Sequence, residues 1–140
     1  MKPKFIDYYM KIAEVTSGLS YAKRLQVGAV IVKDNQILAT GYNGMPSGWE
    51  NVCEHEHNGE LTTKREVLHA ETNAIAKVAQ STESSLGATL FCTHAPCIEC
   101  AKLIYQSGIK TIYYKHEYRS DDGIKFLQLS GVNVHQHNID

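Results

Sequence analysis

The chain has 140 residues, a length that suits one compact domain, and we expect a single domain over residues 1–140. Fourteen basic and fifteen acidic residues give a formal net charge of −1. This balance disfavours a protein that grips a nucleic-acid polymer through many phosphates, and it favours a small-molecule substrate. No apolar run approaches the ~20 residues that cross a bilayer, and the opening MKPKFIDYYM is too polar for a signal peptide. We therefore expect a cytoplasmic protein with no membrane contact.

The first half of the chain predicts a helix followed by a hairpin. Apolar side chains recur at helical spacing from Phe5 to Val15. Two apolar, β-branched runs, Val27–Val32 and Ile37–Tyr42, flank the turn signal Asp34-Asn35 and are typical of paired strands. The next segment, Gly41–Glu66, is rich in glycine and polar residues and has no period, so it predicts a long loop of the kind that carries function.

The second half alternates helices and strands. The predicted elements are a helix at His69–Ala79, a strand at Leu86–Thr93, a helix at Cys97–Gln106, a strand at Ile109–Tyr114, a helix at Asp121–Leu129 and a strand at Val132–Val134. Strands joined through helices pair in parallel. We therefore expect an α/β protein with a mixed five-stranded sheet covered on both faces, a three-layer α/β/α sandwich.

Three potential metal ligands open two of the predicted helices. His69 begins one helix, and Cys97 and Cys100 lie in the first turn of the other, where the helix dipole favours the thiolate that binds metal. One His and two Cys leave a fourth tetrahedral position for water, as in a catalytic zinc site. Glu71 lies close enough in sequence to His69 to move protons above the metal without binding it.

The order H-x-E followed by P-C-x-x-C is the known signature of the zinc-dependent base deaminases. Two other interpretations fit these residues less well. A structural zinc knuckle normally needs a fourth protein ligand and leaves Glu71 unexplained. A redox C-x-x-C pair leaves His69 without a role.

With these motifs in place, the chain resembles the deoxycytidylate (dCMP) deaminases of the cytidine deaminase superfamily. The matching stretches are QVGAVIVKDNQILATGYNGMPSG, LHAETNAI and THAPCIECAKLIYQSGIKTIYY. The resemblance implies the cytidine deaminase-like fold and zinc-dependent hydrolysis of dCMP to dUMP with release of ammonia, which supplies dUMP for thymidylate synthesis. It also implies that Glu71 acts as both base and acid.

The resemblance also implies candidate contacts to the nucleoside. Asn43 matches a sugar-contacting asparagine, although Asn-Gly is a turn signal in its own right. Ala95 precedes the cysteine motif and could offer a backbone group to the base. Tyr118 matches a tyrosine near the nucleotide, with surface packing as the alternative.

A monophosphate substrate also needs a phosphate pocket. Ser20, Lys23 and Arg24 lie in a stretch similar to a serine- and arginine-containing segment of the family. Of these, Arg24 is favoured because its guanidinium suits phosphate. His94 is left open between facing the phosphate and packing beside the metal helix.

Some members of the family carry a second, structural zinc in the long loop. Here Cys53, His55 and His57 are three candidate ligands, while a solvated acidic loop explains them nearly as well. Cys92 lies within a predicted strand and is expected to be a small buried hydrophobe. The resemblance also implies a homo-oligomer, often a hexamer, that dCTP activates and dTTP inhibits; because this chain is short and its loop abbreviated, such regulation is left open.

Two rival functions and one wider substrate range remain open. A deaminase acting on a base in RNA or DNA shares the zinc site, but the near-neutral charge argues against it. A non-catalytic zinc module predicts a filled fourth coordination position. An enzyme that takes dCTP as well as dCMP is compatible with the same motifs.

Overall fold

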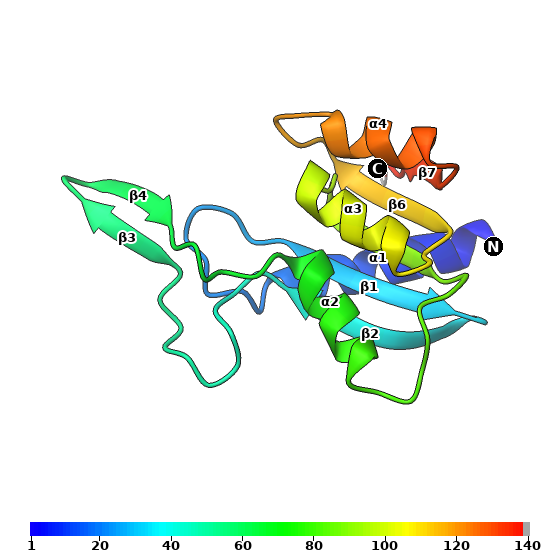
Figure 1. The fold of residues 1–140 in the computed structure, drawn as a ribbon, viewed down its shortest axis with the longest axis horizontal. Helices are drawn as coiled ribbons and strands as arrows, with labels where there is room; N and C mark the ends of the chain where they lie inside the picture. The colour runs from blue at the N-terminus through cyan, green and yellow to red at the C-terminus, as the bar shows by residue number, and fades with distance from the viewer. Residues whose placement is uncertain (139–140) are drawn as a thin grey trace.

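A five-stranded mixed sheet forms the centre of the fold (Figure 1). In this computed structural model, which describes residues 1–138, the strand order is β2-β1-β5-β6-β7. The strands are β1 (Gly28–Lys33), β2 (Gln36–Tyr42), β5 (Thr89–His94), β6 (Thr111–His116) and β7 (Asn133–Gln136). β1 pairs antiparallel with β2 and β5, whereas β5, β6 and β7 run parallel. The predicted mixed five-stranded sheet is confirmed.

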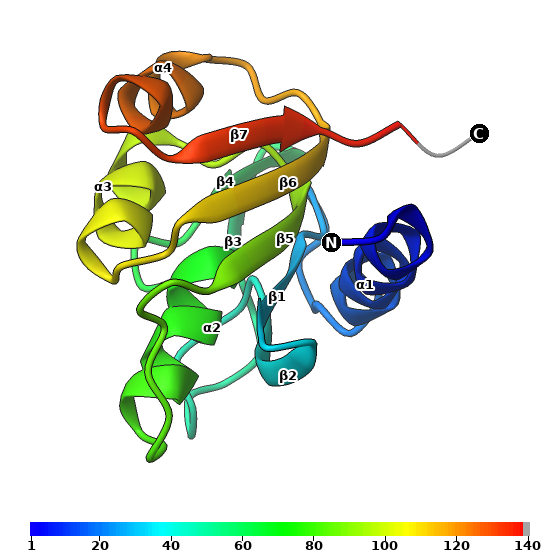
Figure 2. The same ribbon diagram turned by 90° about the vertical axis from the view of Figure 1, so that its right-hand side faces the viewer.

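Helices cover both faces of this sheet (Figure 2). Helix α1 (Pro3–Ser17) lies on one face, and α2 (Ala70–Ala79), α3 (Ile98–Gln106) and α4 (Asp122–Leu129) lie on the other. Two apolar cores separate the layers, because β1 is buried along nearly its whole length and sends side chains to both. The three-layer α/β/α sandwich is therefore confirmed. Within residues 1–138, no helix combines the length and apolar character needed to span a bilayer.

A two-stranded hairpin replaces part of the predicted long loop. Strands β3 (Glu54–His57) and β4 (Glu60–Thr63) pair antiparallel and project away from the sandwich (Figure 1). Their turn is made by Asn58 and Gly59, with φ of 52° and 81°, the conformation of a type I′ hairpin turn. The loop prediction is wrong here because EHEH and ELTT place polar groups on both faces, so no apolar alternation marks the strands.

Two glycines let the elements that carry the metal motifs pack closely. A Cβ on Gly41 of β2 would lie 2.4 Å from the carbonyl oxygen of Ala70, so β2 rests directly on the start of α2. A Cβ on Gly123 of α4 would lie 2.2 Å from the carbonyl oxygen of Pro96. Because no side chain larger than glycine fits at either place, these contacts set the position of both metal-binding segments.

Candidate active site

Three donor atoms meet where the first turns of α2 and α3 approach each other. His69 and Cys97 are the N-cap residues of these helices, and Cys100 lies in the first turn of α3. The Nδ1 atom of His69 lies 3.1 Å from the Sγ of Cys100 and 3.6 Å from the Sγ of Cys97. Zinc bond lengths and a tetrahedral angle place such N and S donors about 3.6 Å apart. The donors therefore fit a zinc ion, with three protein ligands and a fourth position left over.

The electrostatics of the group prepare one thiolate before any metal binds. Hydrogen bonds from Cys100 and from His69 lower the pKa of the Cys97 thiol to about 3. The same contact with Cys97, together with burial, raises the pKa of Cys100, and the hydrogen bond to Cys97 raises the pKa of His69. Protons held on Cys100 and His69 must therefore leave when a metal binds.

Glu71 lies in the first turn of α2, two residues beyond His69. Glu71 is only 4% exposed, yet it lines the same cavity as the metal ligands His69 and Cys97. Burial raises the pKa of its carboxyl group. A carboxyl group whose pKa is moved toward neutrality can both take up and release a proton, which is the behaviour required of a general acid–base.

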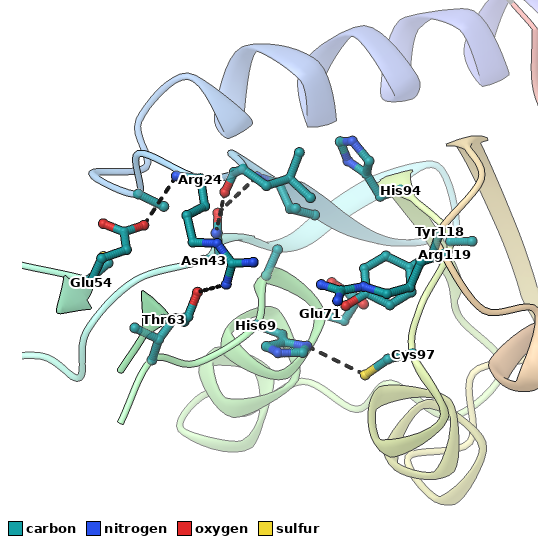
Figure 3. Close-up of a pocket in the computed structure, with 17 residues that line it drawn as sticks. Arg24, Asn43, Glu54, Thr63, His69, Glu71, His94, Cys97, Tyr118 and Arg119 are labelled. Atoms are coloured by element: carbon teal, nitrogen blue, oxygen red, sulfur yellow. Dashed lines mark hydrogen bonds between the residues drawn. The ribbon is translucent and has the colours of Figure 1, made fainter. Parts of the chain in front are cut away.

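The metal donors open onto a cavity of about 320 Å³, a size within the usual range for small-molecule sites (Figure 3). In Figure 3, Arg24, Asn43 and Thr63 lie on one side, and Glu71, Cys97 and Tyr118 lie on the other. The remaining polar or ionisable lining residues are Cys53, Glu54, His69, His94 and Arg119. Segments separated by up to about two thirds of the chain thus converge on one site.

Asn43 lines this cavity, but its amide group also has structural partners. The Oδ1 atom accepts a hydrogen bond from the backbone N–H of Val27 at 2.8 Å, and Nδ2 donates to the carbonyl of Leu25 at 2.7 Å. One amide hydrogen and one lone pair of Asn43 remain for another partner.

The structure separates the three residues predicted for a phosphate pocket. Ser20 is 6% exposed and donates to the carbonyl oxygen of Asn43, and it is not among the cavity-lining residues. Lys23 is likewise absent from the lining. The prediction that Ser20 and Lys23 form the pocket is therefore corrected: the hydroxyl of Ser20 is used by the carbonyl of Asn43, and of the three residues Arg24 alone lines the cavity.

Three further candidates line the cavity. The backbone N–H of Ala95 already donates to the carbonyl oxygen of His116, so only the carbonyl of Ala95 is left for a ligand. His94 contacts the hydroxyl of Thr93 through Nδ1 at 2.8 Å, and burial lowers the pKa of its imidazole. Tyr118 lies with its ring beneath the guanidinium of Arg119, 5.4 Å from the ring centre.

The structure does not gather the three candidate ligands of a second metal site, Cys53, His55 and His57, into one group. Cys53 is buried, whereas His55 and His57 are exposed on β3. Across residues 1–138, the group of three or more donors close enough to share a metal ion is that of His69, Cys97 and Cys100. Cys92 is fully buried in β5, as predicted.

Three polar residues of the cavity are not predicted by the sequence: Glu54, Thr63 and Arg119. The first two lie at the base of the hairpin, and the dipeptide Asn58-Gly59 between two short polar runs was the signal for it. Arg119 directly follows the candidate Tyr118, but its place in the cavity depends on the path of the chain after β6.

The fold and the three-donor group define a zinc-binding α/β protein with the deaminase signature. A family model described as the cytidine and deoxycytidylate deaminase zinc-binding region matches residues 3–116. The deoxycytidylate deaminase of Saccharomyces cerevisiae is 34% identical over 143 residues, covering 97% of this chain and 46% of the yeast protein. The human deoxycytidylate deaminase is 37% identical over 126 residues, covering 83% and 67% of the two chains.

A solved structure gives a longer match. The dCMP deaminase from the cyanophage S-TIM5, in complex with dCMP and dUMP, is 50% identical with a TM-score of 0.92, covering 98% of this chain and 99% of that one. The chain belongs to the cytidine and deoxycytidylate deaminase family, whose zinc-binding region it contains. It spans about half the length of the yeast relative.

Proposed function

We propose that this chain is a zinc-dependent dCMP deaminase, which hydrolyses dCMP to dUMP and ammonia and so supplies dUMP for thymidylate synthesis. The observation that carries the proposal is the meeting of His69, Cys97 and Cys100 beside the buried carboxyl of Glu71, in a cavity that also contains Arg24. The similarity to a cyanophage enzyme solved with dCMP and dUMP supports the choice of substrate.

In this proposal, His69, Cys97 and Cys100 hold the zinc ion. When bound, zinc makes a coordinated water acidic enough to react near neutral pH. Glu71 would take one proton from the attacking water and pass it to N3 of the cytosine ring. It would then take the second proton from the hydroxyl formed at C4 and pass it to the amine, which leaves as ammonia. Its raised pKa supports this role, because a carboxyl group that titrates nearer neutrality exchanges protons readily in both directions.

Arg24 is proposed to bind the phosphate of the nucleotide. Its side chain lines the cavity, and one of its five N–H donors is used by Thr63, so the others remain for phosphate oxygens. Asn43 is proposed to contact the sugar, and the carbonyl of Ala95 to contact the base. Tyr118 and His94 complete the walls around the nucleotide.

The test is ammonia release from dCMP, CMP, dCTP and deoxycytidine, measured side by side on the zinc-loaded protein. We expect the highest kcat/KM with dCMP. Glu71→Gln should keep its zinc and lose roughly 10²–10⁴-fold in kcat, the usual contribution of a general acid–base. Near-normal activity of that variant would refute the proposed proton transfer, and equal activity on deoxycytidine would refute the phosphate site.

We also propose that dCTP and dTTP regulate the enzyme and that it works as a hexamer. A second cavity of about 360 Å³ beside the loop after β2 supports a nucleotide regulator, because three aromatic residues (Tyr21, Tyr42 and Trp49) and the cationic Lys77 line it. Saturation curves for dCMP with and without each triphosphate test the regulation. Sedimentation velocity tests the assembly, and a monomer at assay concentration would refute it.

A further inference from the structure

Asn43 anchors the loop that carries Arg24 near both of its ends. Near its start, the hydroxyl of Ser20 donates to the carbonyl of Asn43. Near its end, the N–H of Val27 donates to the Oδ1 of Asn43. Arg24 lies between these points, in a segment with no regular secondary structure and with an exposed side chain. Fixing such a long side chain for a ligand costs rotamer freedom unless other groups already hold it.

The base of the β3–β4 hairpin holds the middle of this loop. The Oε2 atom of Glu54 accepts hydrogen bonds from the backbone N–H groups of Lys23 and Arg24, at 3.0 and 3.2 Å. The Oγ1 atom of Thr63 accepts a hydrogen bond from Nη1 of Arg24 at 3.0 Å. Glu54 and Thr63 lie directly opposite each other in the hairpin. This one cross-strand pair therefore contacts Arg24 twice, Glu54 at its backbone and Thr63 at its guanidinium (Figure 3).

The chemistry of Glu54 fits positioning rather than ligand binding. The residue is 8% exposed and lies on the wall of a cavity proposed to take an anion. A carboxylate repels a phosphate, but it is a strong acceptor for two adjacent backbone N–H groups. The two hydrogen bonds to the loop therefore explain why the carboxylate of Glu54 is buried here.

We propose that Glu54 and Thr63 are positioning residues that hold Arg24 ready for the phosphate of the substrate. This inference rests on the proposed function, since it assumes a nucleotide phosphate at Arg24. The role of the projecting hairpin is then to support the specificity of the active site from outside the sandwich. Substrates with a phosphate should depend on it, and the corresponding nucleoside should not.

The test compares dCMP with deoxycytidine in steady-state kinetics on the full, zinc-loaded chain. Glu54→Ala should raise KM for dCMP about tenfold, the scale of losing hydrogen bonds to a charged group. The kcat for dCMP and the kcat/KM for deoxycytidine should stay within about twofold of the wild type, because the metal site and Glu71 are untouched. Thr63→Val should give a smaller rise in the same direction.

Conservative variants and a double mutant sharpen the test. Glu54→Gln keeps an acceptor oxygen and should retain most of the preference for dCMP, as should Thr63→Ser. Glu56→Ala removes an exposed carboxylate from the same hairpin and serves as the matched control. In an Arg24→Ala background, Glu54→Ala should have no further effect on the KM for dCMP, because both changes remove one interaction.

Each alternative result overturns the inference. An equal loss for dCMP and deoxycytidine in Glu54→Ala would make Glu54 merely structural, and an unchanged KM for dCMP would make it irrelevant. If Glu54→Ala does not fold, an unchanged preference in Thr63→Val decides against the inference. If the wild type prefers dCMP and the variants keep that preference, this inference is wrong but the proposed function stands. If the wild type shows no preference for dCMP, or no activity, the proposed function is wrong as well.

Discussion

Replacing Gly123 with alanine tests whether α4 sets the position of the cysteine motif. The added Cβ would lie 2.2 Å from the carbonyl oxygen of Pro96 and 2.9 Å from the carbonyl carbon and oxygen of Cys97. Relief of this clash requires a backbone shift of roughly 1 Å, and overpacking of this kind costs about 1–3 kcal/mol. The higher helix propensity of alanine returns at most about 1 kcal/mol. We therefore expect a net loss of unfolding free energy and a displaced Cys97.

Urea unfolding of the zinc-loaded protein measures the first effect, and competition with a chromogenic chelator measures the second. We expect zinc affinity to fall about tenfold, as for other changes to the groups that support metal ligands. Gly44→Ala is the matched control, because its Cβ would meet nothing closer than a ring carbon of Tyr42 at 3.9 Å. If Gly123→Ala gained stability and kept its zinc, the close packing of α4 on the motif would be refuted.

Two further predictions concern the rest of the cavity. Asn43→Ala removes the links to Leu25 and Val27 and should lower the unfolding free energy by about 1–3 kcal/mol, measured by urea denaturation; an unchanged midpoint would contradict this. Burial, aided by the charge of His116, lowers the pKa of His94 from 6.5, so the folded protein binds fewer protons than the unfolded chain. The unfolding free energy should therefore fall as the pH drops from 6.5 toward the lowered pKa. His94→Gln should remove this part of the pH dependence, measured by urea denaturation at several pH values. If the unfolding free energies of the two proteins differed by the same amount at every pH, the prediction would be wrong.

The sequence by itself determined the chemistry of the metal site. His69, Glu71, Cys97 and Cys100 lie within two short motifs, and each motif begins a helix whose local geometry sets the spacing of its ligands. The mixed sheet was equally predictable, because the apolar runs of β1, β5 and β6 and the helices between them leave few ways to pair.

Only the tertiary structure decided how the pocket is built. Arg24 and Arg119 come from two loops and Thr63 from the end of β4, and no local pattern says which of these side chains meet across a cavity. The sequence does not reveal the polar hairpin, because strand prediction depends on one buried face and both faces of this hairpin are largely exposed. Backbone geometry sets the spacing of ligands within one turn of a helix. The partners of Arg24, Glu54 and Thr63, lie 30 and 39 residues away in the chain, so only the folded structure brings them to it.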